Sequence, residues 1–225
     1  MLSKVHSATL LGLEAMVVTI EVDNFDGGQS SRFAIVGLPD NAVKESQERV
    51  QSALRVNGYK APFKSVVINL APADIRKEGT GFDLPMAIGV MLSFEFLQIE
   101  NPERFMFVGE LGLDGSILPV KGILPISIKA RELGYEALFV PAENAREAAV
   151  VNKLKVYAVN HLNDIVNFFN GSVPVEPTLV NTREEFYSQL FNFESDFSEV
   201  RGQENVKRAF EVAAAGGHNI ILVGS

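Results

Sequence analysis

Residues 66–91 constrain the fold most, because they join two segments that both need to be buried. Residues 66–70 form a short β-branched run, stopped by an Ala-Pro pair, which is typical of a central strand. Residues 84–97 are apolar nearly all the way round and predict a buried helix with Pro85 in its first turn, where a missing amide hydrogen costs little. The loop between them, residues 74–83, carries several charged side chains and is therefore a candidate functional site.

The rest of the chain alternates between strand and helix patterns. Its beginning predicts an antiparallel start of three strands joined by tight turns, at residues 4–10, 14–25 and 31–36, followed by a helix that Asp40 caps. The second half alternates as right-handed βαβ units do, with strands at residues 105–110, 137–140 and 156–159 and helices at residues 121–133, 141–150 and 161–169. This pattern predicts an α+β fold with α/β character and a mixed sheet.

The composition excludes several classes of protein. Without cysteine, the chain cannot form disulfides or cysteine-based zinc and redox sites. Its three histidines are far apart in the sequence, and we expect each to be a surface or capping residue rather than a metal ligand. No apolar run approaches the roughly 20 residues of a membrane span, and residues 1–16 lack the pattern of a signal peptide. We therefore expect no metal site, no membrane partner and a cytoplasmic location.

The net charge of −8 is unevenly distributed along the chain. Residues 163–199 alone sum to −6, whereas residues 41–77 carry seven basic against three acidic side chains. A local positive excess can meet phosphates, although a solvated helix face and loop is the simpler interpretation, which we favour. The cations that form a possible docking surface for DNA or a neighbouring subunit are Lys44, Arg49, Arg55, Arg76 and Lys77.

Two changes of pattern divide the chain into three parts. Residues 1–170 form the predicted main domain. Residues 171–197 are acidic, contain prolines and lack sustained periodicity, which is typical of a linker. Within this linker we expect one short helix, residues 183–190, that docks through Phe186 and Leu190.

Residues 198–225 begin a new unit. They predict a helix at residues 203–215, then two glycines, then an apolar strand at residues 219–223 that ends in Gly224 and Ser225. A glycine-rich turn directly after a strand is how phosphate-binding loops begin, because it aims backbone amides at a phosphate. On its own, this ending also fits any strand of an α/β domain.

The same tail contains the set Val200, Gly202 and Gln203 and the run AAAGGHN at residues 213–219. This set resembles the beginning of the AAA+ module of the Mg-chelatase-like ComM family. The resemblance implies that Val200, Gly202 and Gln203 contact a nucleotide, and that ATP and Mg²⁺ bind in the complete protein. It assigns the start of the phosphate-binding loop to Gly224 and Ser225. Since the rest of that loop is missing, we expect no cofactor on this stretch alone.

Three segments of the main domain stand out: GLPDNAVKESQERVQSAL (residues 37–54), VINLAPADIRKEGTGFDLPMAIG (residues 67–89) and GELGLDGSILPVKGI (residues 109–123). They resemble the N-terminal domain of the same family. That domain is similar in fold to the proteolytic domain of Lon protease, the ribosomal protein S5 domain 2-like fold. The resemblance therefore implies a Lon-like domain, a linker, and a fragment of an α/β AAA+ P-loop domain.

A Lon-like fold raises the question of a protease, because Lon-type enzymes use a serine activated by a lysine. Laid on this sequence, the serine position falls on Gly81 and the lysine position on Leu124. Thr80 and Lys121 are the nearest replacements, but a displacement of one residue in a tight loop misdirects the side chain. We therefore predict that no catalytic residue is present here.

The charged loop then needs another explanation. We expect Asp83 to cap the buried helix, with Glu78 and Lys77 at the loop surface; the docking surface defined above is the alternative. For the complete protein, the resemblance implies a hexameric ring motor that hydrolyses ATP and drives DNA branch migration during recombination of incoming DNA. Two other functions stay open: the motor subunit of a metal chelatase, and a residual Lon-like Ser/Thr–Lys peptidase.

Overall fold

The structure is a computed structural model that describes residues 2–26, 32–60, 64–172, 175–181 and 196–224. The chain divides into two compact units, Met1–Val180 and Asn181–Ser225, which we describe separately. The predicted helix at residues 183–190 lies outside the described residues.

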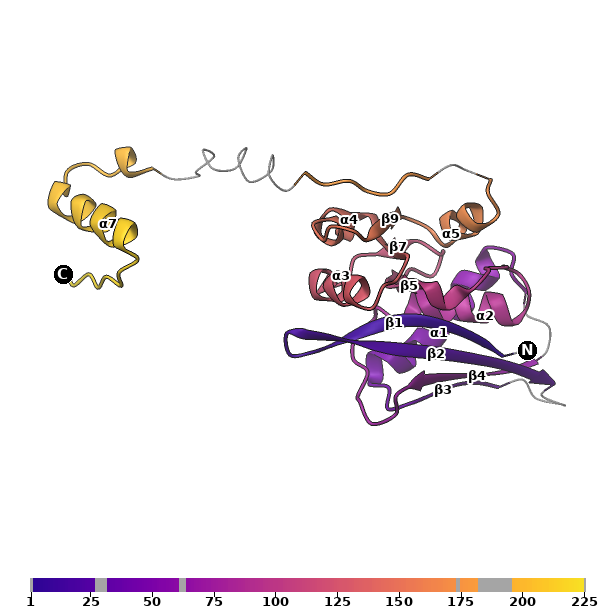
Figure 1. The fold of residues 1–225 in the computed structure, drawn as a ribbon. Helices are drawn as coiled ribbons and strands as arrows, with labels where there is room; N and C mark the ends of the chain where they lie inside the picture. Colours follow the sequence, from indigo (N-terminus) through magenta and orange to yellow (C-terminus); the bar gives the residue numbers. More distant parts are fainter. Residues whose placement is uncertain (1, 27–31, 61–63, 173–174, 182–195, 225) are drawn as a thin grey trace. The chain divides into compact units, whose positions relative to one another are not determined.

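Unit 1 is built on a mixed sheet with the strand order β3-β4-β2-β1-β5-β8-β9 (Figure 1). The pairs β1/β2 and β2/β4 are antiparallel, and the other neighbouring pairs are parallel. This confirms the predicted α+β class with a mixed sheet. The strands are β1 (Ser3–Leu11), β2 (Glu14–Asp26), β3 (Phe33–Val36), β4 (Lys64–Ala71), β5 (Phe105–Phe107), β8 (Ala137–Pro141) and β9 (Lys155–Val159). A separate ribbon pairs β6 (Glu110–Leu111) with β7 (Ile117–Leu118).

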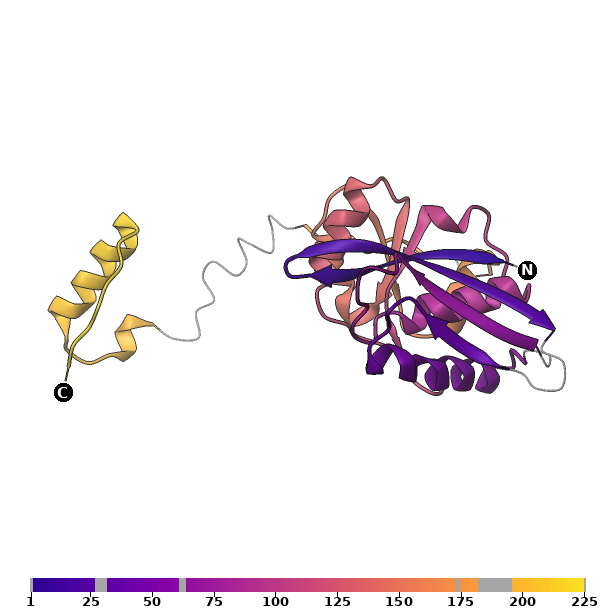
Figure 2. The ribbon, with the colours of Figure 1, turned by 90° about the horizontal axis from the view of Figure 1, so that it is seen from below.

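Helices cover both faces of this sheet, as the alternation of buried side chains requires (Figure 2). On β2, Val18, Ile20 and Val22 belong to the core cluster that contains α2, whereas Ala15 belongs to the cluster on the opposite face that contains Ile123 of α3. The helices are α1 (Asn41–Val56), α2 (Asp83–Ser93), α3 (Ile123–Glu132), α4 (Ala142–Ala149) and α5 (Leu162–Phe169), with the 3-10 turn η1 at Pro102–Arg104.

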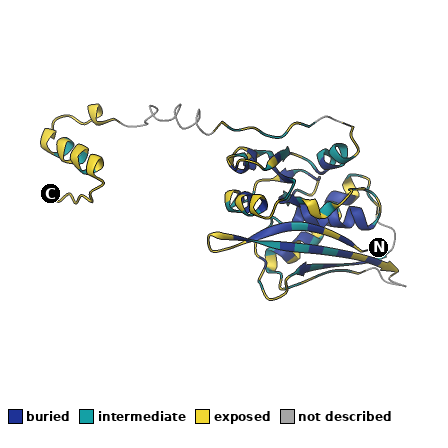
Figure 3. Ribbon diagram, viewed as in Figure 1, coloured by how far each residue is buried: buried dark blue, intermediate teal, exposed yellow. Residues whose placement is uncertain are grey.

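Helix α2 is the centre of the fold, since every one of its residues is buried (Figure 3). It packs on β1 and β2 on one side and on α1 on the other. This explains why its sequence shows no polar face: a helix surrounded by protein needs none. The organising role that the sequence predicts for residues 66–91 is therefore confirmed.

Unit 2 contains the 3-10 turn η2 (Phe197–Glu199) and the helix α7 (Glu204–Gly216). The predicted strand at residues 219–223 is wrong, because these residues carry no strand pairing, and Val223 is 91% exposed. A strand needs a neighbour to bind its backbone groups, and unit 2 offers none among its described residues. The predicted domain boundaries at residues 170 and 197 stay predictions.

Candidate functional site

The charged loop lies where the carboxyl end of β5 meets the start of α2. The amide of Gly109 donates to the carbonyl of Gly81 at 3.0 Å, and the amide of Leu84 donates to the carbonyl of Gly109, also at 3.0 Å. These two bonds fix residues 81–84 against the chain that follows β5. Gly81, which the sequence resemblance places at the Lon serine position, is therefore held in one defined place.

Gly81 has apolar neighbours. A Cβ atom built on it would lie 3.4 Å from Val108 Cγ1 and 3.7 Å from Val120 Cγ1, which is ordinary contact distance. A side chain would fit, but it would meet two valine methyl groups rather than a base. Leu124, the predicted lysine position, is 37% exposed, and Lys121 is exposed as well. An exposed lysine lacks the desolvation that would make it a general base.

The replacement hydroxyl is already engaged. Thr80 Oγ1 donates a hydrogen bond to Glu110 Oε2, which belongs to β6. A carboxylate is a weak base for an alcohol at neutral pH. The bond from Thr80 therefore joins the loop to β6, and the surroundings of Thr80 do not support a role as a nucleophile.

The acidic group of the site is Asp83, the first residue of α2, and it is fully buried. Arg49 of α1 binds it through two bonds, from Nε to Oδ2 at 2.5 Å and from Nη2 to Oδ1 at 3.0 Å. The amide of Leu111 also donates to Asp83 Oδ2, at 3.1 Å. Burial raises the pKa of Asp83, against the opposing effect of Arg49, and the bond to Asp83 raises the pKa of Arg49.

The predicted helix cap is therefore wrong. The N-cap position of α2 is Phe82, which makes no side-chain cap bond, and Asp83 instead joins α1, α2 and β6. The reason is that a carboxylate without solvent needs a cation, and Arg49 presents a planar fork that matches it. The other predicted cap, Asp40 on α1, is confirmed, since its Oδ1 accepts from the amide of Val43 at 2.8 Å.

Lys77 is also buried, which corrects its predicted place at the loop surface. Its ammonium group donates to the carbonyls of Pro72 and Ile75, so the lysine is enclosed by its own loop. Desolvation lowers the pKa of Lys77. Its backbone receives a bond from Asp40 and donates one to Leu38, which ties the loop to the segment before α1.

These placements reduce the predicted cationic surface. Arg49 and Lys77 are engaged inside the fold, whereas Lys44, Arg55 and Arg76 are exposed. Arg76 Nε lies 3.3 Å from Glu78 Oε1, an exposed ion pair of little energetic consequence.

The predicted nucleotide residues lie in unit 2. Val200 is exposed, and Gly202 and Gln203 have positive φ angles of 70° and 62° directly before α7. No heavy atom lies within 4 Å of a Cβ built on Gly202, so no other described residue packs against this side of the turn. Gly224 is exposed, and Ser225 lies outside the described residues.

Metal-binding clusters and membrane-spanning helices are both absent from the described residues. Within those residues no group of three or more His, Cys, Asp or Glu side chains could hold a metal ion. No helix in the described part of the chain is long and apolar enough to cross a membrane. The prediction for His161 is confirmed, because its Nδ1 accepts from the amide of Asn163 at the start of α5.

The fold and the site together define a Lon-like α+β domain followed by a separate C-terminal unit. Comparison with known families agrees with this class. Residues 20–144 match the family model described as "Subunit ChlI of Mg-chelatase", and residues 196–225 match "Magnesium chelatase, subunit ChlI". The chain belongs to the Mg-chelatase ChlI family, as a ComM-type, Mg-chelatase-like AAA+ protein.

Individual relatives give the same result. The chain is 38% identical to "Competence protein ComM" of Haemophilus influenzae over 225 residues, which cover 99% of this chain and 43% of the relative. It is 36% identical to "Uncharacterized protein YifB" of Escherichia coli, over 99% of this chain and 42% of the relative. "Lon protease 2" of Bacillus subtilis is 25% identical over 60% of this chain and 24% of its own length. The chain thus spans less than half the length of the ComM and YifB relatives.

Proposed function

We propose that this chain supplies the non-proteolytic Lon-like domain of an ATP-driven AAA+ motor that acts on branched DNA. The observation that carries the proposal is the pairing of two features. The resemblance to Lon-type proteases assigns the serine and lysine positions to Gly81 and Leu124, and a Cβ built on Gly81 would meet Val108 and Val120. At the same time the tail matches the Mg-chelatase family model. Such a domain shapes or guides the motor rather than cutting peptides.

The proposal assigns ATP and Mg²⁺ to the complete protein. Val200, Gly202 and Gln203 would lie against the nucleotide, and Gly224 and Ser225 would begin the loop that holds its phosphates. The open turn at Gly202 supports this assignment, since its two left-handed residues leave the backbone accessible before α7. We further propose a hexameric ring in the cytoplasm.

DNA is the proposed substrate because the name of the Haemophilus relative links it to competence, the uptake of DNA. In the Lon-like domain the exposed cations Lys44 and Arg55 are eleven residues apart, which places them on one face of α1. Glu48 lies between them on that face and weakens its potential. The domain therefore guides DNA weakly at most, and the motor supplies the main contacts.

One alternative has a specific observation in its favour. The descriptions of both family models name magnesium chelatase. A motor subunit of a metal chelatase is therefore the second candidate. Such a motor would respond to a tetrapyrrole-bearing partner rather than to DNA.

The deciding experiment measures the ATPase rate of the complete protein with a four-way DNA junction and with linear DNA of the same composition. We expect the junction to stimulate the rate about tenfold above linear DNA, equivalent to about 1.4 kcal/mol in the barrier. Gln203→Ala should raise the KM for ATP under both conditions. Equal rates with and without DNA would reject the DNA motor and favour the chelatase candidate.

A further inference from the structure

A groove of about 1300 Å³ lies at the edge of the sheet opposite the charged loop. It is lined by the first residues of four neighbouring strands that run parallel: Ser3 of β1, Phe105 of β5, Ala137 of β8 and Lys155 of β9. In open α/β sheets, ligands ordinarily bind outside the carboxyl ends of the strands. The groove is therefore a second feature, separate from the site derived from the Lon-like fold.

The floor of the groove is aromatic and only half-buried. Phe105 and Phe169 have ring centroids 5.3 Å apart, and Tyr157 and Phe168 have centroids 4.6 Å apart. All four side chains have intermediate exposure. Aromatic rings of this kind bind apolar side chains well, because each buries a large area with little loss of conformational freedom.

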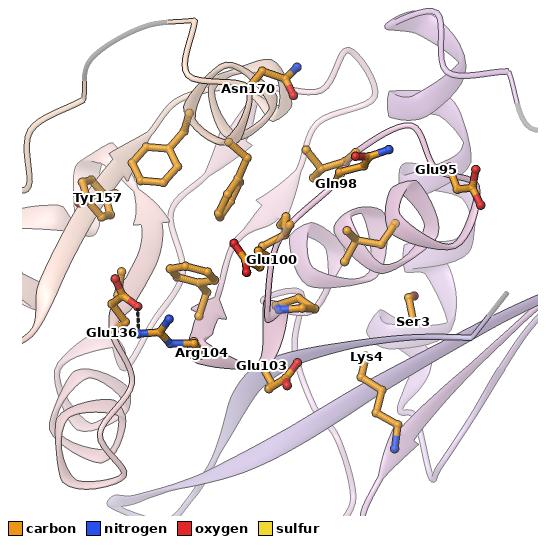
Figure 4. Close-up of a pocket in the computed structure, with 18 of the residues that line it drawn as sticks. Ser3, Lys4, Glu95, Gln98, Glu100, Glu103, Arg104, Glu136, Tyr157 and Asn170 are labelled. Atoms are coloured by element: carbon orange, nitrogen blue, oxygen red, sulfur yellow. Dashed lines mark ion pairs between the residues drawn. The ribbon is translucent and has the colours of Figure 1, made fainter.

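The lining of the groove also carries acidic side chains. In Figure 4, Glu100 lies between Glu95 on one side and Tyr157 on the other. Two of the lining cations are already paired: Arg104 lies 2.7 Å from Glu136, and Lys4 lies 3.1 Å from Glu21.

Three lining carboxylates have no ion pair among the described residues: Glu95, Glu100 and Glu103. Against them stands Lys155, which likewise has no ion pair in the described part of the chain. The unpaired groups of the groove therefore sum to a negative charge, and the potential favours a cationic occupant.

We infer that this groove binds a protein segment that carries both apolar and basic side chains. The apolar side chains would lie on the aromatic floor, and Lys or Arg side chains would reach the carboxylates and the ring faces. Nucleic acid and anionic lipid are disfavoured, since both would bring phosphates toward Glu95, Glu100 and Glu103. The volume exceeds the range of about 300–1000 Å³ that is usual for small-molecule pockets, which favours an extended ligand.

This inference goes beyond the proposed function and does not depend on it, because the groove lies in the Lon-like unit and its test uses no nucleotide or DNA. The probe is a fluorescein-labelled amphipathic peptide of about 14 residues built from Leu and Lys, which spans about 20 Å as a helix. Fluorescence anisotropy measures its binding to the 225-residue chain. Two comparison peptides replace every Lys by Glu, or every Leu by Ser.

The charge reversals Glu100→Lys and Glu103→Lys, made together, should weaken binding of the Leu/Lys peptide at least about tenfold. The matched control is Glu48→Lys with Glu143→Lys, which changes the net charge equally at exposed positions outside the groove. The control should bind within about twofold of the unchanged chain, and both comparison peptides should bind at least about tenfold more weakly. Thermal unfolding checks that the variants fold.

Equal losses in the reversal and in its control would overturn the inference, because attraction by net charge alone would then explain binding. Equal binding of the Glu-containing peptide would overturn it as well. A variant that fails to fold is replaced by Glu100→Gln with Glu103→Gln, which removes the charge without reversing it and should weaken binding by a smaller factor.

Discussion

Arg49 and Asp83 form a two-point ion pair across the interface between α1 and α2, with N–O distances of 2.5 Å and 3.0 Å. Asp83 has no solvent exposure, and the side chain of Arg49 retains 18%. The pair therefore lies where the core meets the charged loop, residues 74–83, which resembles the serine loop of Lon. The role of this pair is structural, since it joins α1 to the start of α2.

Removing one partner of this pair should destabilise the fold strongly. Arg49→Met leaves the carboxylate of Asp83 buried without a cation, and we expect a loss of about 3–5 kcal/mol in the free energy of unfolding. Adding Asp83→Asn should recover most of that loss, because no buried charge then remains. Urea denaturation measures both. Arg55→Met, an exposed position on the same helix, is the control and should change stability by less than about 0.5 kcal/mol.

Two glycines with similar backbone angles should respond differently to alanine. Gly37 has a φ of 102°, and a Cβ built on it would lie 2.2 Å from the carbonyl oxygen of Leu70. Gly58 has a φ of 84° and no heavy atom within 4 Å of its Cβ position. Gly58→Ala should cost about 1 kcal/mol for its backbone angle alone, and Gly37→Ala should cost at least about 1 kcal/mol more. Equal losses in thermal unfolding would contradict the close approach of β4 to Gly37.

Restoring a serine should not restore a protease. Gly81→Ser is expected to fold, since its Cβ would sit at ordinary contact distance from Val108. It should show no hydrolysis of a fluorogenic casein substrate, because Leu124 supplies no base. The double variant Gly81→Ser with Leu124→Lys tests whether the dyad alone is missing, and we expect it to be inactive too, since position 124 is too exposed to lower the pKa of a lysine. Casein hydrolysis by the unchanged chain that is lost in Thr80→Ala would reject this prediction.

Alkaline pH should destabilise the domain through Tyr135. Burial raises the pKa of Tyr135 to about 12, from an ordinary value of 10.0, and its hydroxyl bonds with His6 Nδ1 at 2.8 Å. Because the folded state favours the neutral phenol, its contribution is complete below pH 10.0 and is lost as the pH rises toward about 12. In Tyr135→Phe, the melting temperature should decrease less over this pH range than in the unchanged chain. Absorbance titration of the unchanged chain should show a tyrosine that ionises at high pH. This late ionisation should be missing from the titration of Tyr135→Phe.

Much of the fold follows from local patterns. The alternation of Val18, Ile20 and Val22 predicts β2, and the continuous apolar character of α2 predicts its burial; both are confirmed. The strand predicted at residues 219–223 is absent, because an apolar pattern produces a strand only where a neighbouring strand pairs with it. The resemblance to the ComM family is carried by short motifs and is confirmed by the family models.

The sequence by itself determined the class of fold, the positions of most strands and helices, and the family. Only the tertiary structure decided which charged residues are interior. The sequence predicts Lys77 at the loop surface and Asp83 as a helix cap, because most charged side chains stay in water. Their burial depends on partners that packing supplies: the loop carbonyls for Lys77, and Arg49, distant in the chain, for Asp83. Such pairing is a property of three-dimensional contact, which the order of residues along the chain does not encode locally.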